Sequence, residues 1–386
     1  MVFTVAQPRQ MIIGGGARHD IGELIASLGV QRPLLVTDSF LNGNGSAGGL
    51  IDRMVGAGLQ LALWPETVPD PTTDSLRSGV TAVAEHGADL VIGFGGGSPI
   101  DTAKAIALLA VQGGEMSDYR APRRNDGVAL PIVAIPTTAG SGSEATQFTI
   151  ITDTASEEKM LCTGPAFLPA AAVIDFELTL SMPARLTADT GVDALTHAVE
   201  AYVSHRANGF SDGLALTAIS AIGRHLRRVY ADGADRDARE AMMLAATQAG
   251  IAFSNSSVAL VHGMSRPIGA HFHVAHGLSN AMLFAAVTRF SIPAAESRYA
   301  DCARALGCAS AADGDAEAAR MLVDELEALC RDLAVPTPES FGIAEEAWQR
   351  AIPVMVEQAL ASGSPNNNPR VPTPDDVASI YTAIFR

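Results

Sequence analysis

The sequence lacks the features that mark membrane and secreted proteins. No uninterrupted apolar run reaches about 18 residues, the length needed to cross a bilayer. The N-terminus has no charged segment followed by an apolar one, as a secretory signal has. The four cysteines, at 162, 302, 308 and 330, have no CxxC spacing, so neither a disulfide framework nor a zinc finger is predicted. We expect a cytoplasmic protein with reduced thiols and no membrane association.

Basic residues are also scarce. The chain has 26 Lys and Arg against 42 Asp and Glu, which gives a formal net charge of -16. Nucleic-acid binding needs a basic stripe, and the basic residues here are scattered among more numerous carboxylates. A nucleic-acid partner is therefore not expected.

The distribution of apolar residues predicts two domains of different class. Short β-rich runs alternate with helical segments in the first half, the clearest at 34–37, 90–94, 132–135 and 172–175. Such alternation is typical of a parallel sheet covered by helices. After residue 182 the pattern changes to Ala- and Leu-rich helical stretches, at 212–230, 237–253 and 315–333. We predict an α/β domain over 1–182 and an all-helical domain over 183–386.

Two glycine-rich segments follow predicted strands. Gly95, Gly96, Gly97 and Ser98 lie between the strand at 90–94 and a helical run at 99–109. Backbone amides and a helix N-terminus would meet there, which favours a phosphate or pyrophosphate, although a tight structural turn has the same sequence. The second segment, PTTAGSGSE at 136–144, would approach the same crevice at the carboxyl ends of the strands.

An earlier glycine run does not fit the dinucleotide fingerprint. After Gly14-Gly15-Gly16, GxGxxG would require glycine at position 19, where the chain has histidine. Asp38 follows the strand at 34–37 and could accept hydrogen bonds from a ribose, while its charge disfavours a 2′-phosphate. These residues favour NAD(H) over NADP(H).

Four side chains in the second half form a candidate metal site. Asp193 and His197 are four residues apart, so on a helix they share one face. His262 and His276 would complete a set of three nitrogens and one oxygen, which suits divalent iron, zinc or manganese better than calcium or magnesium. The alternative is that these histidines are ordinary surface or core residues.

Taken together, the segment GGGSPIDTAK at 95–104, the segment at 136–144, the Asp193-x3-His197 pair, His262-Gly-Met and His276-Gly closely resemble the iron-containing alcohol dehydrogenase family. The resemblance spans nearly the whole chain. It implies a Rossmann-like dinucleotide-binding domain followed by a helical domain, with Asp193, His197, His262 and His276 as ligands of a divalent metal, Fe²⁺ before Zn²⁺ or Mn²⁺.

The resemblance also implies a set of cofactor contacts. Gly95 to Ser98 would hold the pyrophosphate, with Asp101 on the same helix, and Asp38 the adenosine ribose. Thr137, Thr138 and Ser141 would line the nicotinamide side, and Lys159 would contact the cofactor ribose.

The implied activity is hydride transfer between NAD(H) and a small primary alcohol or aldehyde, with a metal polarising the substrate oxygen. Phe148 and Phe253 are candidate walls of the substrate pocket, although isolated aromatics are as often core. His273 is a candidate proton relay.

One position departs from the family pattern. Many members carry a second histidine four residues after the third ligand, and here that position is Arg266. If Arg266 faces the pocket, it could pair with a carboxylate, sulfonate or phosphonate, which suggests a semialdehyde or hydroxy acid as substrate. The alternative is an arginine salt-bridged to an acidic neighbour.

Other functions compete with this interpretation. Within the superfamily these are a glycerol-dehydrogenase-like polyol oxidoreductase, a hydroxyacid-oxoacid transhydrogenase and a dehydroquinate synthase, although the last would need a basic cluster in the helical domain that is not seen. A non-catalytic metal- or nucleotide-binding protein belongs to a different class. The resemblance further suggests a homodimer or a larger assembly of dimers.

Overall fold

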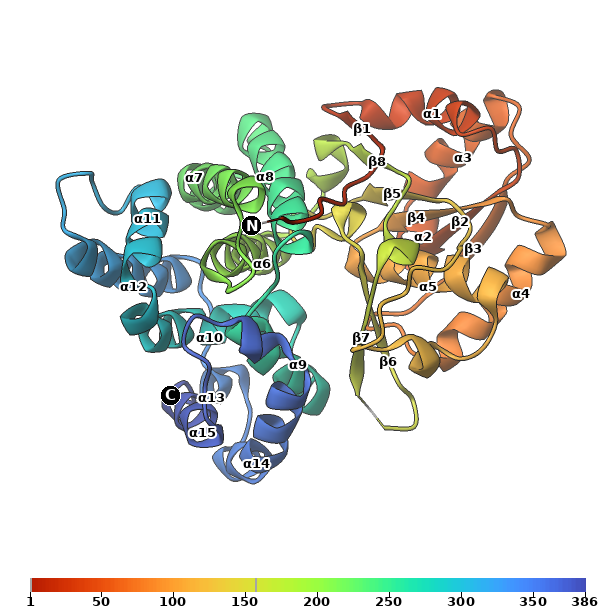
Figure 1. The fold of residues 1–386 in the computed structure, drawn as a ribbon. Coiled ribbons are helices and arrows are strands. Elements are labelled where there is room, and N and C mark those ends of the chain that lie inside the picture. The colour runs from red at the N-terminus through yellow and green to blue at the C-terminus, as the bar shows by residue number, and fades with distance from the viewer. Residues whose placement is uncertain (1, 157) are drawn as a thin grey trace. The chain divides into compact units, whose positions relative to one another are not determined.

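The computed structural model describes residues 2–156 and 158–386. The chain forms two compact units, Val5–Leu180 and Ser181–Arg386, with residues 2–4 grouped with the second unit. The first unit is α/β and the second is helical, which confirms the predicted fold class (Figure 1). No helix among the described residues is long and apolar enough to cross a membrane.

The first unit is built on a six-stranded sheet in the order β1-β8-β5-β4-β2-β3, in which every neighbouring pair is parallel. The strands are β1 (Gln10–Ile13), β2 (Pro33–Asp38), β3 (Ala62–Thr67), β4 (Leu90–Gly95), β5 (Ile132–Pro136) and β8 (Ala171–Ile174). The four strands expected from the sequence are β2, β4, β5 and β8, and the strands that were not expected, β1 and β3, are the edges of the sheet.

Helices cover both faces of this sheet because alternate strand residues point to opposite sides. Leu34 and Val36 pack with side chains from α4 (Arg77–His86) and α5 (Gly97–Gln112). Leu35 lies between them in the strand, points to the opposite face of the sheet and packs with the helices on that face. These are α1 (Ile21–Ser27), α2 (Ser39–Gly43) and α3 (Ser46–Gly56).

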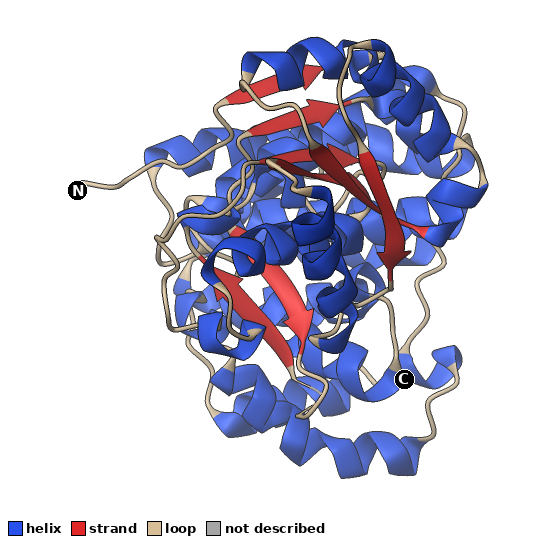
Figure 2. Ribbon diagram, turned by 90° about the vertical axis from the view of Figure 1, so that its right-hand side faces the viewer, coloured by secondary structure: helices blue, strands red, loops and turns tan. Residues whose placement is uncertain are grey.

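A two-stranded antiparallel hairpin, β6 (Phe148–Thr152) and β7 (Lys159–Thr163), stands apart from the large sheet (Figure 2). Its strands alternate half-buried and buried residues, the pattern of a ribbon with one packed face. The hairpin was not predicted from the sequence. It packs against α5, the helix that follows the first glycine-rich segment.

The second unit is a helical array around α6. Its helices are α6 (Ala184–Val203), α7 (Gly209–Ala231), α8 (Arg236–Ser254), α9 (Leu260–Phe272), α10 (His276–Ser291), α11 (Glu296–Leu306), α12 (Asp315–Asp332), α13 (Pro338–Phe341), α14 (Glu345–Ala361) and α15 (Pro374–Ala383). The helix α6 contacts α7, α8, α9, α10 and α11, and from residue 191 to 203 every residue is buried. A helix buried on all sides can carry polar groups only where partners satisfy them.

Candidate functional site

The central helix α6 places three polar side chains on one buried face. Asp193, His197 and Glu200 are spaced four and three residues apart, so they follow one another along the helix. All three residues are at most 4 % exposed. Charged groups at such depth need partners, and the helices α9 and α10 supply them (Figure 1).

Asp193 and the three histidines come together as one cluster. Each of Asp193, His197, His262 and His276 offers a ligand atom, and these four atoms lie within 4.8 Å of one another. The Asp193 Oδ1 atom is 3.5 Å from His262 Nε2, 3.6 Å from His276 Nε2 and 3.9 Å from His197 Nδ1. Ligand atoms around a tetrahedral metal with bonds near 2.1 Å are about 3.4 Å apart. The donor set therefore fits a divalent transition metal after small side-chain shifts.

Electrostatics keep the carboxylate of this cluster ionised. Burial alone would raise the pKa of Asp193, but the adjacent imidazoles of His197, His276 and His262 hold it well below its usual range. Asn280, one turn after His276 on α10, donates a 2.7 Å hydrogen bond from Nδ2 to Asp193 Oδ1. The ligand oxygen is thus held in its charged form and in one orientation.

Glu200 is a functional residue that sequence reasoning missed. Its Oε2 lies 2.7 Å from His262 Nδ1, and it also accepts the backbone N–H groups of Ala259 and Val261 at 2.8 and 2.6 Å. Ala259 is the N-cap residue of α9 and Val261 lies in its first turn, so neither amide has an intrahelical acceptor. The available signal was the spacing of Glu200 seven residues after Asp193, on the same helical face.

Aromatic packing fixes the ring of His197. It stacks on Phe253 at a centroid distance of 4.2 Å and on His262 at 4.4 Å. The Phe253 side chain is buried, so in the helical unit it serves as a wall of the metal cluster. Phe148 belongs to β6 in the other unit and is half-buried.

His273 does not join the cluster. It ends α9 in the left-handed region with φ of 55°, and its side chain is exposed. Among the described residues, the His273 side chain makes no hydrogen bond, ion pair or ring contact, so its part in proton transfer stays a prediction. Arg266, by contrast, lies one turn after His262 on α9, half-buried, with its Nη1 3.3 Å from the Ser364 hydroxyl.

The glycine-rich segments meet at the carboxyl edge of the sheet in the α/β unit. β4 ends at Gly95 and its neighbour β5 at Pro136, and Thr137 N–H donates to the Gly95 carbonyl at 2.9 Å. A Cβ built on Gly96 would lie 3.4 Å from the Thr138 side chain. Likewise, one built on Gly97 would lie 3.4 Å from Ser141. The two segments therefore form one continuous surface.

This surface has the properties of a phosphate site. The helix α5 begins at Gly97 with no side-chain cap on its first amides, and Ser98 is half-buried beside them. The N-terminus of a 16-residue helix favours an anion. On the other side of β4, β2 ends at Asp38, and the strand order reverses between β2 and β4. Ligands of open α/β sheets bind at such a reversal.

Asp38 and Lys159 also make contacts within the protein. Asp38 caps α2 by accepting the Leu41 N–H at 2.8 Å through Oδ1. Lys159, on β7, forms a 2.8 Å ion pair with Asp70. A ribose contact by Lys159 would have to share or replace this pair.

Asp101 has a structural role in this unit. Its Oδ1 accepts from the Ser143 hydroxyl at 2.6 Å and its Oδ2 from the Ile150 N–H at 2.9 Å. On the same helix Lys104 donates from Nζ to Ser143, Thr146 and the Phe148 carbonyl, at distances of 2.7 to 3.1 Å. Together, Asp101 and Lys104 tie α5 to the second glycine-rich segment and to the hairpin, and a cofactor contact of Asp101 stays a prediction.

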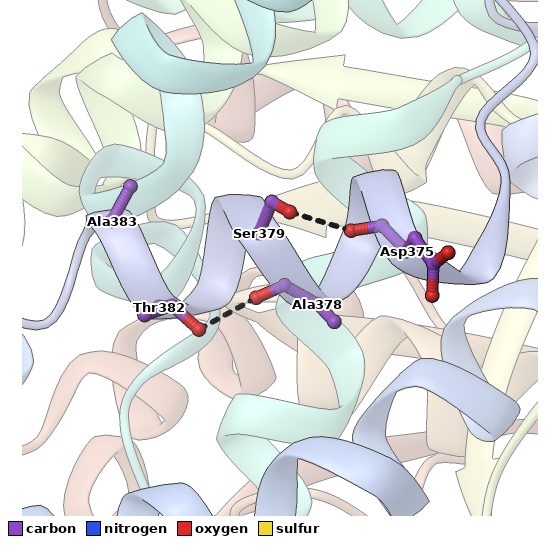
Figure 3. A pocket seen from close by; sticks show the side chains of 5 residues that line it. All are labelled: Asp375, Ala378, Ser379, Thr382 and Ala383. Atoms are coloured by element: carbon purple, nitrogen blue, oxygen red, sulfur yellow. Dashed lines mark hydrogen bonds between the residues drawn. The ribbon is translucent and has the colours of Figure 1, made fainter.

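A shallow hollow on α15 carries no comparable chemistry. Its lining comprises Asp375, Ala378, Ser379, Thr382 and Ala383 (Figure 3). The Ser379 and Thr382 hydroxyls donate to carbonyls one turn earlier in the same helix, at 2.7 and 2.9 Å. The hollow shares no residue with the metal cluster or with Arg266.

Comparisons with known proteins show which chains resemble this one over its whole length. Residues 8–176 match the model of the iron-containing alcohol dehydrogenases, and residues 187–385 match that of the C-terminal part of the Fe-containing alcohol dehydrogenase family. The NAD-dependent methanol dehydrogenase of Bacillus methanolicus is 36% identical over 97% of both chains. The crystal structure of a 1,3-propanediol oxidoreductase superposes with a TM-score of 0.95 at 33% identity over the whole of both chains. Sulfoacetaldehyde reductase from Bifidobacterium kashiwanohense, solved with NAD⁺, gives 0.88 at 26% identity over 100% of this chain and 99% of the other.

Proposed function

Because this chain belongs to the iron-containing alcohol dehydrogenase family, we propose that it interconverts a small primary alcohol and its aldehyde with NAD(H) as hydride carrier. The observation that carries the proposal is the buried cluster of Asp193, His197, His262 and His276. A divalent metal held there would act as a Lewis acid on the substrate oxygen. Because Asp193 and the three histidines already supply four ligands, the substrate oxygen would enter as a fifth ligand, an expansion that catalytic metal sites allow.

The two halves of the chain have separate parts in this proposal. Residues 1–182 bind the dinucleotide: Gly95 to Ser98 and the start of α5 hold the pyrophosphate, and Thr137, Thr138 and Ser141 line the nicotinamide side. Asp38 binds the adenosine ribose, and its charge favours NAD(H) over NADP(H). Residues 183–386 bind metal and substrate. Fe²⁺ is the metal we propose, with Zn²⁺ and Mn²⁺ as alternatives for a site of nitrogen and oxygen donors.

The protein's own residues prepare the site for this chemistry. Glu200 accepts from His262 Nδ1, which directs Nε2 of that ring towards Asp193 and the other ligands. Phe253 packs on His197 and excludes water from that side of the ring. Exclusion of water strengthens every charge interaction at the metal.

The test is oxidation of NADH by metal-reconstituted protein supplied with a panel of aldehydes, followed by loss of absorbance of the reduced cofactor. An EDTA-stripped sample is the control, and NADPH replaces NADH in a parallel series. Turnover that requires both the metal and NADH is the expected result. Turnover in the absence of added cofactor would favour a transhydrogenase, and binding of NADH without turnover of any aldehyde would favour a non-catalytic protein.

We also propose that the chain assembles as a homodimer. The edge strand β1 pairs only with β8 among the described residues, and its terminal Ile13 is 49 % exposed. An open edge with an apolar side chain suits pairing with a second copy. Sedimentation would test the assembly, and a monomer at micromolar concentration would contradict it.

A further inference from the structure

The relatives do not determine the charge of the substrate, since methanol is neutral and sulfoacetaldehyde bears a sulfonate. This chain's own residues offer a better indication at Arg266. It follows His262 by one turn of α9, so both side chains lie on neighbouring parts of one helix face. Long side chains on a helix lean towards its N-terminus, here towards the turn that carries His262.

The surroundings of Arg266 use little of its hydrogen-bonding capacity. A guanidinium has five N–H donors. Among the described residues the one hydrogen bond of Arg266 is the 3.3 Å contact with the hydroxyl of Ser364, which lies in the short helix η8 (Ser364–Asn367). Arg266 forms no ion pair with any described carboxylate. The structural salt bridge that the sequence left open as an alternative is therefore not formed.

Another buried arginine shows how this chain treats a purely structural guanidinium. Arg239 is 2 % exposed and donates to the Gly233 carbonyl, the Thr187 hydroxyl and the Met182 carbonyl at 2.9, 2.9 and 3.2 Å. Arg266 has one weaker bond in place of three. The N–H groups of Arg266 on the nitrogens other than Nη1 are therefore available to an external acceptor.

Glu200, the carboxylate whose charge acts on Arg266, cannot serve as its ion-pair partner. Burial lowers the pKa of Arg266 to about 10, and Glu200 opposes that shift. Both oxygens of Glu200 are already engaged, by His262 and by two amides of α9. The guanidinium is therefore a charge without a paired anion among the described residues, one helical turn after the ligand His262.

The charges of the loaded site do not cancel. Asp193 and Glu200 together carry two negative charges, and a divalent metal would neutralise them. Arg266 then adds one positive charge that no described carboxylate pairs with, and its half-buried side chain is only partly hydrated, which favours an accompanying anion. A histidine at this position could stay neutral, whereas arginine cannot.

We propose that Arg266 forms a subsite for an anionic oxygen group on the substrate, so that the enzyme acts on an aldehyde or alcohol that carries a carboxylate or sulfonate. A planar oxyanion would accept two parallel N–H bonds from the guanidinium fork. Ser364 accepts from Nη1 and leaves the other nitrogens for the substrate group. This inference rests on the proposed dehydrogenase function and assigns its substrate class.

The test compares succinate semialdehyde with butanal, which match in chain length and differ in the carboxylate. The kcat/KM ratio for the two aldehydes is measured for the wild type, Arg266→Met, Arg266→Lys and Arg266→His. The ratio should favour succinate semialdehyde in the wild type and fall by about 10- to 100-fold in Arg266→Met. Arg266→Lys should recover part of it, because lysine keeps the charge without the fork.

The matched control is Arg350→Met, which removes an exposed arginine of α14 and should leave the ratio unchanged. A wild-type ratio near one would overturn the subsite while leaving the dehydrogenase function intact. An unchanged ratio in Arg266→Met, accompanied by a lower melting temperature, would assign Arg266 a structural role. A raised KM for NADH with no change in the ratio would make it a cofactor contact. Absence of turnover with either aldehyde would instead remove the proposed function itself.

Discussion

Glu200 and His262 face each other at 2.7 Å between Oε2 and Nδ1, inside a pocket where both side chains are 4 % exposed. A carboxylate at that position accepts a hydrogen bond from Nδ1–H. The proton of the neutral imidazole therefore stays on Nδ1, and Nε2 is its basic nitrogen. Nε2 is the atom that lies 3.5 Å from Asp193 Oδ1. Because Glu200 also accepts two amides of α9, it fixes the position of the helix and the tautomer of the ligand together.

Glu200→Gln should therefore weaken metal binding. The amide keeps the size of the side chain but loses the charge that supports the imidazole, and changes of this kind cost about 10- to 100-fold in metal affinity. Zinc titration of the stripped protein by calorimetry measures the effect. Glu240→Gln, on the exposed side of α8, is the control and should bind zinc as the wild type does. Equal zinc affinity in the two variants would show that Glu200 serves only to cap α9.

Gly277 allows α10 to approach α6 closely. A Cβ at this position would lie 2.3 Å from the Asp189 carbonyl oxygen and 3.3 Å from Asp193 Cβ. Gly277→Ala should therefore push the helices apart and separate His276 from Asp193. We expect a loss of roughly 1–3 kcal/mol in the free energy of unfolding, as for other overpacked cores, together with weaker zinc binding.

The control for this change is Gly213→Ala in α7, where an added Cβ meets nothing within 4 Å. An alanine in an exposed helix should raise the free energy of unfolding by about 0.5–1 kcal/mol. Urea unfolding of the three proteins measures both effects. Equal free energies of unfolding for Gly277→Ala and Gly213→Ala would contradict this, because they would mean that α6 and α10 separate without loss of stability.

The parts of the site that the sequence predicted are those with local signals. Asp193 and His197 could be paired because four residues make one helical turn. The long strands β2, β4 and β5 are central and fully buried along most of their length, so their apolar runs were clear. The contact of Glu200 with His262 spans 62 residues and depends on how α9 packs against α6. No local pattern encodes that packing.

The hairpin and the hydrogen bonds that Asp101 makes to it were not predicted, for a similar reason. From the sequence, Asp101 was expected near the cofactor and Lys104 on a nearby face of the same helix. Their partners, Ser143, Thr146 and Ile150, lie 39 to 49 residues further along the chain. The buried pair identifies what holds the hairpin on α5, and only the folded structure brings these groups together.

The four cysteines should be free and slow to react in the native protein. Burial raises the pKa of Cys162 to about 12 and places that of Cys302 still higher. Burial also raises the pKa values of Cys308 and Cys330 to about 11. The thiolate is the reactive form, and little of it exists at pH 8. A disulfide-exchange reagent should label all four thiols within seconds in denaturant and far more slowly in the native state. Fewer than four thiols in denaturant under non-reducing conditions would contradict the reduced state.

Lys104 should make stability depend on pH above neutrality. Burial lowers its pKa to about 8, although Asp101 and Glu144 oppose the shift, whereas a lysine in the unfolded chain titrates near 10.4. Between these two values the unfolded chain binds a proton that the folded protein has released. The contribution of Lys104 to the free energy of unfolding therefore rises with pH across this window, by at most about 1.4 kcal/mol per pH unit. Below pH 8 Lys104 is protonated in both the folded and the unfolded state. Its contribution to the free energy of unfolding is then independent of pH and at its lowest.

Urea unfolding at half-unit intervals from pH 7.5 to 10.5 tests this, with Lys104→Met as the variant. The variant should be less stable at every pH, because Asp101 loses its buried partner. The informative quantity is the slope: subtracting the variant's curve from that of the wild type cancels the other titrating groups and should leave a rise between pH 8 and 10.4. Arg350→Met, which removes an exposed positive charge, should give a flat difference over the same range. A flat difference for Lys104→Met as well would mean that the buried ammonium stays charged throughout, held by Asp101, Ser143 and the carbonyls of Thr146 and Phe148.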